Sequence, residues 1–224
     1  MPTTFYNLSD PRGQGVSIGE TVSRAYLILA GTLVASAAAA WLGARMPFAW
    51  QHPIILAIAG FACLLLVLFL GAKDSPAAVP AVFGFAVLEG LSLGPLLATY
   101  AAMRGGPLVI VEAAGTTAVI FGALSAYALT SKRDFSFLGG FLFVGLILVV
   151  LAGLANAFLH IPGLQLTVAA VSVLLFSGYI LYDTSRLIRQ PGMSAVLMVV
   201  SLYLDILNLF LALLQLFSAL NQKD

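Results

Sequence analysis

The sequence predicts an all-α integral membrane protein, a bundle of seven transmembrane helices, and three observations lead to this fold class. Hydrophobic residues make up 61% of the 224-residue chain and charged residues only 8%, whereas a soluble domain carries about 25% charged residues. The mean hydropathy is +1.06. The apolar residues gather in long runs that short polar connectors separate. Lipid must therefore solvate much of the apolar surface.

Each run is long enough to cross a bilayer, since a spanning helix needs about 20 mostly apolar residues. The seven runs are residues 25–42, 53–72, 79–103, 108–130, 135–159, 164–183 and 195–220. Proline and glycine in the connectors end the helices, because proline lacks the amide hydrogen and glycine tolerates a positive φ. We therefore expect an N-terminal tail (1–24), a seven-helix domain (25–220) and a C-terminal tail (221–224).

The lysines and arginines of the connectors predict the orientation, because positive charge is concentrated on the cytoplasmic side. With the N-terminus in the cytoplasm, seven lie inside and three outside. The inner seven are Arg12, Arg24, Lys73, Lys132, Arg133, Arg186 and Arg189, and the outer three are Arg45, Arg104 and Lys223. Trp41 and Trp50 fall near the outer end of the first two runs, where interfacial tryptophans are enriched. This arrangement places the C-terminus outside.

Three carboxylates, Glu89, Asp183 and Asp205, lie in or at the edge of these apolar runs. A charge at membrane depth costs roughly 2.5–3.5 kcal/mol on insertion scales, so such residues usually serve a function. Asn208 is three residues after Asp205 and shares its helix face. These four residues are the candidates for a pH sensor or an ion pathway.

Each acid also has a structural interpretation. Glu89 could be a protonated, hydrogen-bonded packing device, since a neutral carboxyl is tolerable in the membrane. Asp183 closes the sixth run and could be a solvated helix end beside Arg186. Asp205 lies well inside the seventh run, so function is favoured over structure there. Elsewhere the chain has no phosphate-binding glycine loop, serine-nucleophile elbow or paired-cysteine motif, and it has no basic cluster for nucleic acid. We predict no resident cofactor.

Asp183 and Asp205 belong to consecutive antiparallel helices, which are expected neighbours. Their depths differ, because Asp205 lies about 15 Å along the last run and Asp183 lies at an edge. The last run is longer than a bilayer requires, and protrusion of its first turns would bring the two acids together. Two adjacent acids share a proton, which makes them a pH switch, or they form a ligand set for a hard cation such as calcium.

Four sequence blocks resemble the Bax inhibitor-1 family of seven-helix membrane proteins. They are Glu89-Gly-Leu-Ser-Leu-Gly-Pro95, Ser136-Phe-Leu-Gly-Gly140, Tyr182-Asp-Thr184 and the run from Ser201 to Phe210. The run from Lys132 to Gly140, with Ala155-Asn156, resembles the bacterial YccA-like branch in particular.

The resemblance implies a central last helix wrapped by the other six, in a bacterial inner membrane. Some members are pH-sensitive calcium leak channels whose paired aspartates correspond to Asp183 and Asp205. In those members an arginine of the second helix can contact the pair, whereas residues 53–72 contain no arginine and the nearest cation is Lys73. YccA-like members restrain the membrane protease FtsH, with the N-terminal tail involved.

These implications give two functional hypotheses. The first is a pH-sensitive cation leak channel, for calcium, with Asp183 and Asp205 as sensor and ion ligands. The alternative is a regulatory membrane protein that binds and modulates FtsH. The expected partners are the lipid bilayer, calcium or protons, and FtsH. An enzyme is disfavoured, because a di-aspartyl intramembrane protease carries Gly-x-Gly-Asp at its second acid and Ser201-Leu-Tyr-Leu-Asp205 has no glycine.

Overall fold

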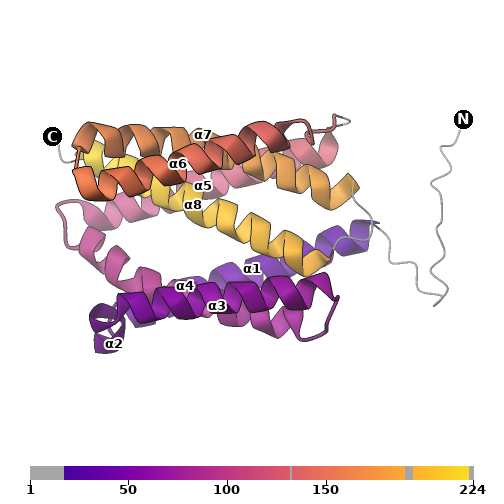
Figure 1. Cartoon of the computed structure of the whole chain (residues 1–224), viewed down its shortest axis with the longest axis horizontal. Coiled ribbons are helices and arrows are strands. Elements are labelled where there is room, and N and C mark those ends of the chain that lie inside the picture. Colours follow the sequence, from indigo (N-terminus) through magenta and orange to yellow (C-terminus); the bar gives the residue numbers. More distant parts are fainter. Residues whose placement is uncertain (1–17, 132, 190–193, 222–224) are drawn as a thin grey trace, which may run out of the picture.

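The computed structural model describes residues 18–131, 133–189 and 194–221, and it consists of eight α-helices joined by short turns (Figure 1). The helices are α1 (Ile18–Gly43), α2 (Pro47–Gln51), α3 (Pro53–Ala72), α4 (Ala78–Ala101), α5 (Gly106–Thr130), α6 (Leu138–Leu159), α7 (Pro162–Arg189) and α8 (Ala195–Asn221). Within these ranges seven helices are long and apolar enough to span a membrane, and only α2 is short. The predicted fold class is confirmed.

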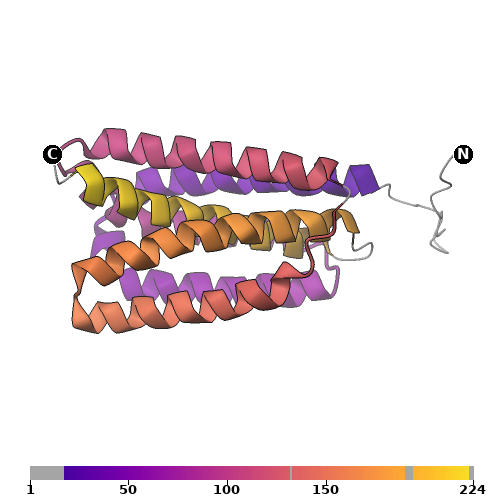
Figure 2. The same ribbon diagram turned by 90° about the horizontal axis from the view of Figure 1, so that it is seen from above.

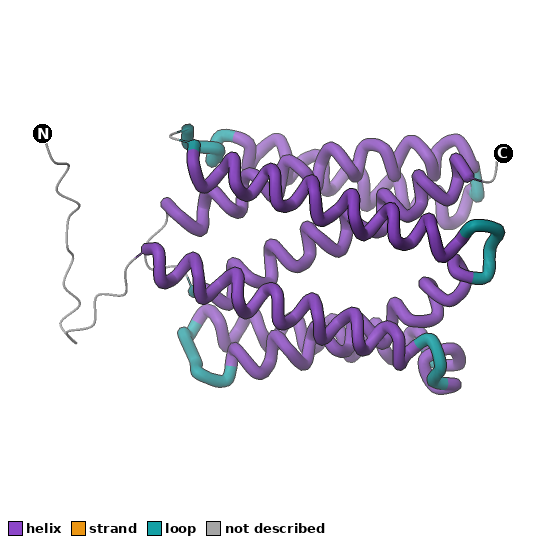
Figure 3. The backbone as a smooth tube through the Cα atoms, turned by 180° about the vertical axis from the view of Figure 1, so that it is seen from behind, coloured by secondary structure: helices purple, strands orange, loops and turns teal. Residues whose placement is uncertain are grey.

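The helices run roughly parallel and antiparallel to one another and form two groups with α8 between them (Figures 1 and 2). One group contains α1, α3 and α4, and the other contains α5, α6 and α7. The described turns lie at the two ends of the bundle, as the view from behind shows (Figure 3). We call the end at which α1 begins the N-terminal end and the opposite one the C-terminal end.

Helix α8 is the central helix. Of its most apolar stretch 56% is buried, against at most 33% for any other spanning helix. It packs against α1, α3, α4, α5 and α7, so the expected central last helix is confirmed. The expectation that all six other helices wrap it is wrong for α6, which packs against α7 instead and leaves most of its side chains for lipid.

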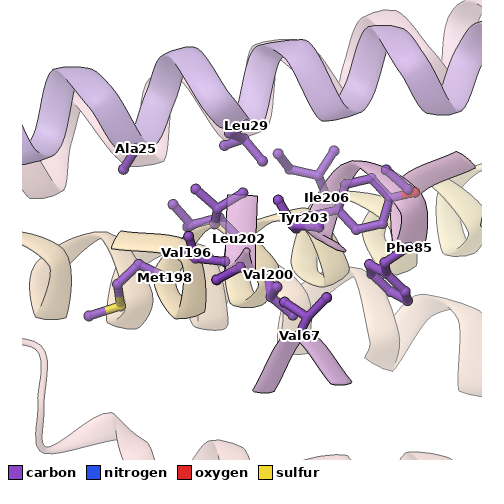
Figure 4. Close-up of a cluster of buried hydrophobic side chains, with 14 of the residues drawn as sticks. Ala25, Leu29, Val67, Phe85, Val196, Met198, Val200, Leu202, Tyr203 and Ile206 are labelled. Atoms are coloured by element: carbon purple, nitrogen blue, oxygen red, sulfur yellow. The ribbon is translucent and has the colours of Figure 1, made fainter. Parts of the chain in front are cut away.

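The core forms around α8 in two clusters of buried side chains. On one side Tyr203 packs edge-on against Phe85 of α4, with ring centroids 5.5 Å apart, and the surrounding aliphatic residues come from α1, α3, α4, α7 and α8 (Figure 4). The Tyr203 hydroxyl group also shares a 2.8 Å hydrogen bond with Ser36 of α1. On the other side Leu209 and Leu213 pack with Phe176 and Ile180 of α7. Helix α8 therefore holds the two groups together.

Helices α1 and α4 approach so closely that their backbones are in contact. A side chain at Gly90 would meet the Ser36 carbonyl group, and one at Gly94 would meet the backbone of Gly43 and Ala44. The two glycines are four residues apart and form the small-xxx-small spacing that lets membrane helices pack at short distance. This packing fixes the rotation of α4 about its axis, and with it the direction in which Glu89 points.

Several helix ends differ from the expected ones. Helix α1 begins at Ile18 and not at residue 25, with Glu20 in its first turn, where a negative charge suits the helix dipole. Helix α6 begins at Leu138, because Asp134 accepts a hydrogen bond from the Ser136 amide and holds that segment in a turn. Helix α7 continues to Arg189, six residues beyond its apolar run, because polar residues can extend a helix that lipid no longer covers.

Some predictions fall on residues outside the described ranges. They concern residues 1–17 of the N-terminal tail, the turn at 190–193, residues 222–224 of the C-terminal tail, and the cations Arg12, Lys132 and Lys223.

Candidate functional site: a buried aspartate pair

The structure brings Asp183 of α7 and Asp205 of α8 together. Both residues are only 5% exposed, and their carboxyl groups are hydrogen-bonded to each other. Asp183 lies six residues before the end of α7 and Asp205 ten residues after the start of α8. The pair lies nearer to the N-terminal end of the bundle than to the C-terminal end.

The length of α7 resolves the difference in depth that the sequence suggested. Because α7 continues to Arg189, Asp183 lies about 9 Å inside the helix and not at its edge. Asp205 is about 15 Å from the start of α8, and the two antiparallel helices pack along their length. The extension of α7 therefore moves Asp183 inward.

Arg186 pairs with Asp183 on the same helix, its Nη1 atom 3.4 Å from Asp183 Oδ1. A hydrogen bond between two carboxyl groups requires a proton on one of them. The guanidinium group favours negative charge on Asp183, so in the singly protonated pair Asp205 is the expected proton donor and the Asp183 carboxylate the acceptor. The chain thus supplies from α7 the cation that the sequence did not offer from the second helix.

One oxygen of the pair, Asp205 Oδ2, is buried without a hydrogen-bond partner in the described part of the chain. A buried polar atom without a partner costs about 1–3 kcal/mol. Asp205 Oδ2 would therefore be stabilised by a hydrogen bond from a donor or by contact with a cation. A resident Ca²⁺ takes 6–8 oxygen ligands. Two carboxylates beside a guanidinium supply too few, and the described residues hold no cluster of three or more His, Cys, Asp or Glu. The pair fits a proton site and does not fit a complete calcium site.

The residues around the pair connect it to α5. The Tyr179 and Tyr182 rings pack edge-on with centroids 6.4 Å apart, and the Tyr182 ring lies 5.3 Å from the Arg186 guanidinium carbon. Next to Asp183, the Thr184 hydroxyl group shares a 3.4 Å hydrogen bond with Ser125 of α5. These contacts join the pair to the packing between α5 and α7.

The α5–α6 turn is also anchored to the end of α7. Ser185 Oγ accepts a hydrogen bond from the Phe135 amide at 3.4 Å, and Arg189 donates to the carbonyl group of Arg133 at 2.7 Å. Helix α6 approaches through Gly139, where an added Cβ would lie 3.0 Å from the Tyr182 ring. A rearrangement of the pair would therefore reach the turn and α6.

Two of the four predicted site residues contact groups other than the pair. Asn208 donates through its Nδ2 atom to the Leu204 carbonyl oxygen of its own helix at 2.7 Å, so this donor is used within α8. Glu89 lies between α3 and α4, where an added Cβ at Gly60 would be 2.9 Å from its Oε1 atom. Glu89 is half-buried and lies among residues of the other helix group. The site is thus the pair with Arg186.

The sequence places Arg186 beside Asp183 at a solvated helix end, and its pairing with a buried Asp183 was not predicted, although the signal was present. The spacing of three residues from Asp183 places the two side chains on one helix face. The end of the apolar run was taken as the end of the helix, which left Arg186 in a connector. The anchoring by Ser185 and Arg189 had no sequence signal, because it depends on how the α5–α6 turn folds back.

Comparison with known proteins identifies the family. The family model described as "Inhibitor of apoptosis-promoting Bax1" matches residues 19–222. The chain belongs to the Bax inhibitor-1 family. An uncharacterized membrane protein of Vibrio cholerae is 38% identical over 226 residues, which cover 100% of both chains.

Two further relatives of this Bax inhibitor-1 family chain come from Escherichia coli. The one named "Modulator of FtsH protease YccA", from strain K12, is 35% identical over 198 residues, or 88% of this chain and 89% of the relative. The one named "Inner membrane protein YccA", from strain O6:H1, matches to the same extent. The resemblance to the family and to its bacterial YccA-like branch is confirmed.

Proposed function

We propose that this chain is a regulatory membrane protein that binds and modulates an FtsH-type membrane protease. One observation carries the proposal: the similarity to the FtsH modulator of E. coli extends over 88% of this chain and 89% of the relative. Similarity over this length covers most of both proteins. It supports the protease modulator over the cation leak channel that the sequence put first.

Reconstitution tests this function. Purified FtsH and a membrane-protein substrate are placed in liposomes, with this chain or with an unrelated seven-helix protein in equal amount. We expect the substrate half-life to lengthen several-fold with this chain alone, and FtsH to copurify with it. Equal half-lives in both samples, without copurification, would exclude the proposal.

A second candidate, a pH-sensitive cation leak, is favoured by the aspartate pair. Its two carboxyl groups are buried and hydrogen-bonded across the α7–α8 interface. As pH rises, loss of the shared proton removes the donor and places two negative charges side by side in a low-dielectric site. The hydrogen bond between the two aspartates then breaks, and the packing of α7 against α8 changes.

Calcium flux into liposomes between pH 5 and pH 8 tests this candidate. Asp205→Asn should abolish the pH dependence and keep the fold, since asparagine is nearly isosteric and does not titrate. If Asp205→Asn and Asp183→Asn both conduct with the pH dependence of the wild type, the pair is structural. No flux in any variant would leave protease modulation as the function of the chain.

The cellular setting follows from the relatives. A multi-pass membrane protein similar to an inner membrane protein of E. coli is expected in a bacterial inner membrane. We propose that its N-terminus is cytoplasmic and its C-terminus outside, as the distribution of lysine and arginine predicts. In either function the chain acts without catalysis.

A further inference from the structure

A polar cleft lies at the C-terminal end of the bundle, far from the aspartate pair. It consists of two cavities of about 310 and 510 Å³ that share Pro162, Gln165 and Gln215 as walls. The smaller cavity lies between the ends of α4, α7 and α8, and the larger one between α6, α7 and α8. The other polar side chains of their walls are Tyr100, Ser218, Asn156 and His160. Cavities of this size with several polar groups are able to hold water.

Polar side chains continue from this cleft toward the middle of the bundle. Ser172 is seven residues after Gln165 on α7, and Asn208 is seven residues before Gln215 on α8, so each pair shares one helix face. Ser172 is buried. Gln215 is about 9 Å from the end of α8, and Asn208 is about 10 Å further along the helix. On α7 these polar side chains end at Ser172, and on α8 they end at Asn208, three residues from Asp205.

An apolar layer lies between the glutamines of this cleft and the aspartate pair, and on α8 it lies beside Asn208. Phe176 and Ile180 lie between Gln165 and Asp183 along α7, and Leu209 and Leu213 lie between Asp205 and Gln215 along α8. These four side chains belong to one buried cluster, and Ile180 and Leu209 are fully buried. Hydrophobic constrictions of this kind stop water and ions in membrane proteins.

We propose that the cleft is a water-filled vestibule for water and small hydrated cations, closed by the layer of Phe176, Ile180, Leu209 and Leu213. Amide and hydroxyl groups, with the His160 imidazole, line the vestibule, and none of its described wall residues is acidic, so it admits hydrated cations without holding them. Water that enters at the C-terminal end does not reach the Asp183–Asp205 pair. The vestibule does not depend on which of the two proposed functions is correct.

Cysteine accessibility tests the vestibule. Single cysteines are placed in a Cys63→Ala background, and a positively charged, membrane-impermeant methanethiosulfonate is added at the C-terminal end. The thiolate attacks the sulfenyl sulfur of the reagent, forming a mixed disulfide and releasing methanesulfinate. Gln215→Cys should react at least tenfold faster than Leu154→Cys, a control that is 56% exposed at similar depth on the lipid-facing helix α6. Ser218→Cys serves as a second reporter if Gln215→Cys does not fold.

Equal, slow reaction at Gln215→Cys and Leu154→Cys would overturn the vestibule. The barrier is tested with Leu209→Cys, which should be at least tenfold slower than Gln215→Cys. Adding Phe176→Ser should then raise the rate at Leu209→Cys severalfold. Fast reaction of Leu209→Cys with Phe176 intact, or no change after Phe176→Ser, would show that this layer is not the barrier.

Discussion

At the scale of single residues, the site depends on the balance of charge between Asp183, Asp205 and Arg186. When the pair holds one proton, that proton and one guanidinium group serve two buried carboxyl groups. Arg186 is partly exposed, with 27% of its side chain accessible, whereas Asp183 is nearly inaccessible. Water thus screens one partner of the ion pair more than the other. Removal of the Arg186 cation would therefore mainly destabilise the charged form of Asp183.

We predict that Arg186→Gln destabilises the protein by about 1–3 kcal/mol at pH 8, because it leaves a buried carboxylate without its cation. The loss should be smaller at pH 5, where the carboxylate can take up a proton. Adding Asp183→Asn should restore part of the stability, since the uncompensated charge is gone. Unfolding midpoints in detergent, measured for both single variants and the double variant, check this. A double variant less stable than Arg186→Gln would contradict it.

Asp134 provides a control for the pH dependence of flux. It is exposed in the α5–α6 turn, and the hydrogen bond from the Ser136 amide lowers the pKa of its carboxyl group below the ordinary value of 3.8. The stability that this hydrogen bond contributes is present when the pH is above the ordinary pKa. It is lost as the pH falls through the lowered pKa of Asp134. Asp134 therefore stays ionised from pH 5 to pH 8. We expect Asp134→Asn to leave the pH dependence of flux unchanged in the liposome assay, whereas Asp205→Asn abolishes it.

At the scale of helices, the closest packing is between α1 and α4. We predict that Gly94→Ala destabilises the protein by about 1–3 kcal/mol, because the added methyl group meets backbone atoms that cannot move aside. Gly122→Ala of α5 is the matched control, since apart from its chain neighbours and its own helix backbone no described atom lies within 4 Å of its added Cβ. That variant should be neutral or more stable by about 0.5–1 kcal/mol, from lower backbone entropy in the unfolded chain. Unfolding midpoints in detergent that are equal for the two variants would contradict the close approach.

The helices themselves could be predicted from the sequence, but their ends and some of their contacts could not. Hydropathy shows where lipid covers a helix, so it located all seven spans and missed the polar last turns of α7. The same limit hid Arg186, which lies in those turns. The pairing of Asp183 with Asp205 was predicted from helix order, whereas the position of Glu89 between α3 and α4 required the actual packing of α4 on α1. The sequence carries no signal for the outward placement of α6, because apolar residues are favoured both in contact with lipid and in the core of the bundle.

At the scale of the whole molecule, the chain places its two polar regions at different depths on either side of an apolar layer. The aspartate pair lies toward the N-terminal end and the vestibule opens at the C-terminal end. Both regions are built from α7 and α8, so a change in the packing of these two helices would affect both. The biological sidedness of each region then depends on the orientation of the chain in the membrane.

We predict that the N-terminal end of the bundle faces the cytoplasm. Among the described residues, five cations lie toward that end and two toward the C-terminal end: Arg24, Lys73, Arg133, Arg186 and Arg189 against Arg45 and Arg104. Trp41 and Trp50 are exposed at the C-terminal end, and Arg45 stacks on Trp41 at 3.7 Å, which suits a membrane interface. Positive charge in short connectors opposes export across the membrane, so the richer end is retained inside.

Single cysteines at exposed turn positions measure this orientation without altering the charge balance. In a Cys63→Ala background, right-side-out membrane vesicles are treated with an impermeant thiol reagent. Ala102→Cys at the C-terminal end should be labelled and Ala77→Cys at the N-terminal end protected until the vesicles are opened. The reverse pattern would mean that the vestibule opens to the cytoplasm and that the aspartate pair lies toward the outer face. A pH sensor in that position would respond to the medium outside and not to the cytoplasm.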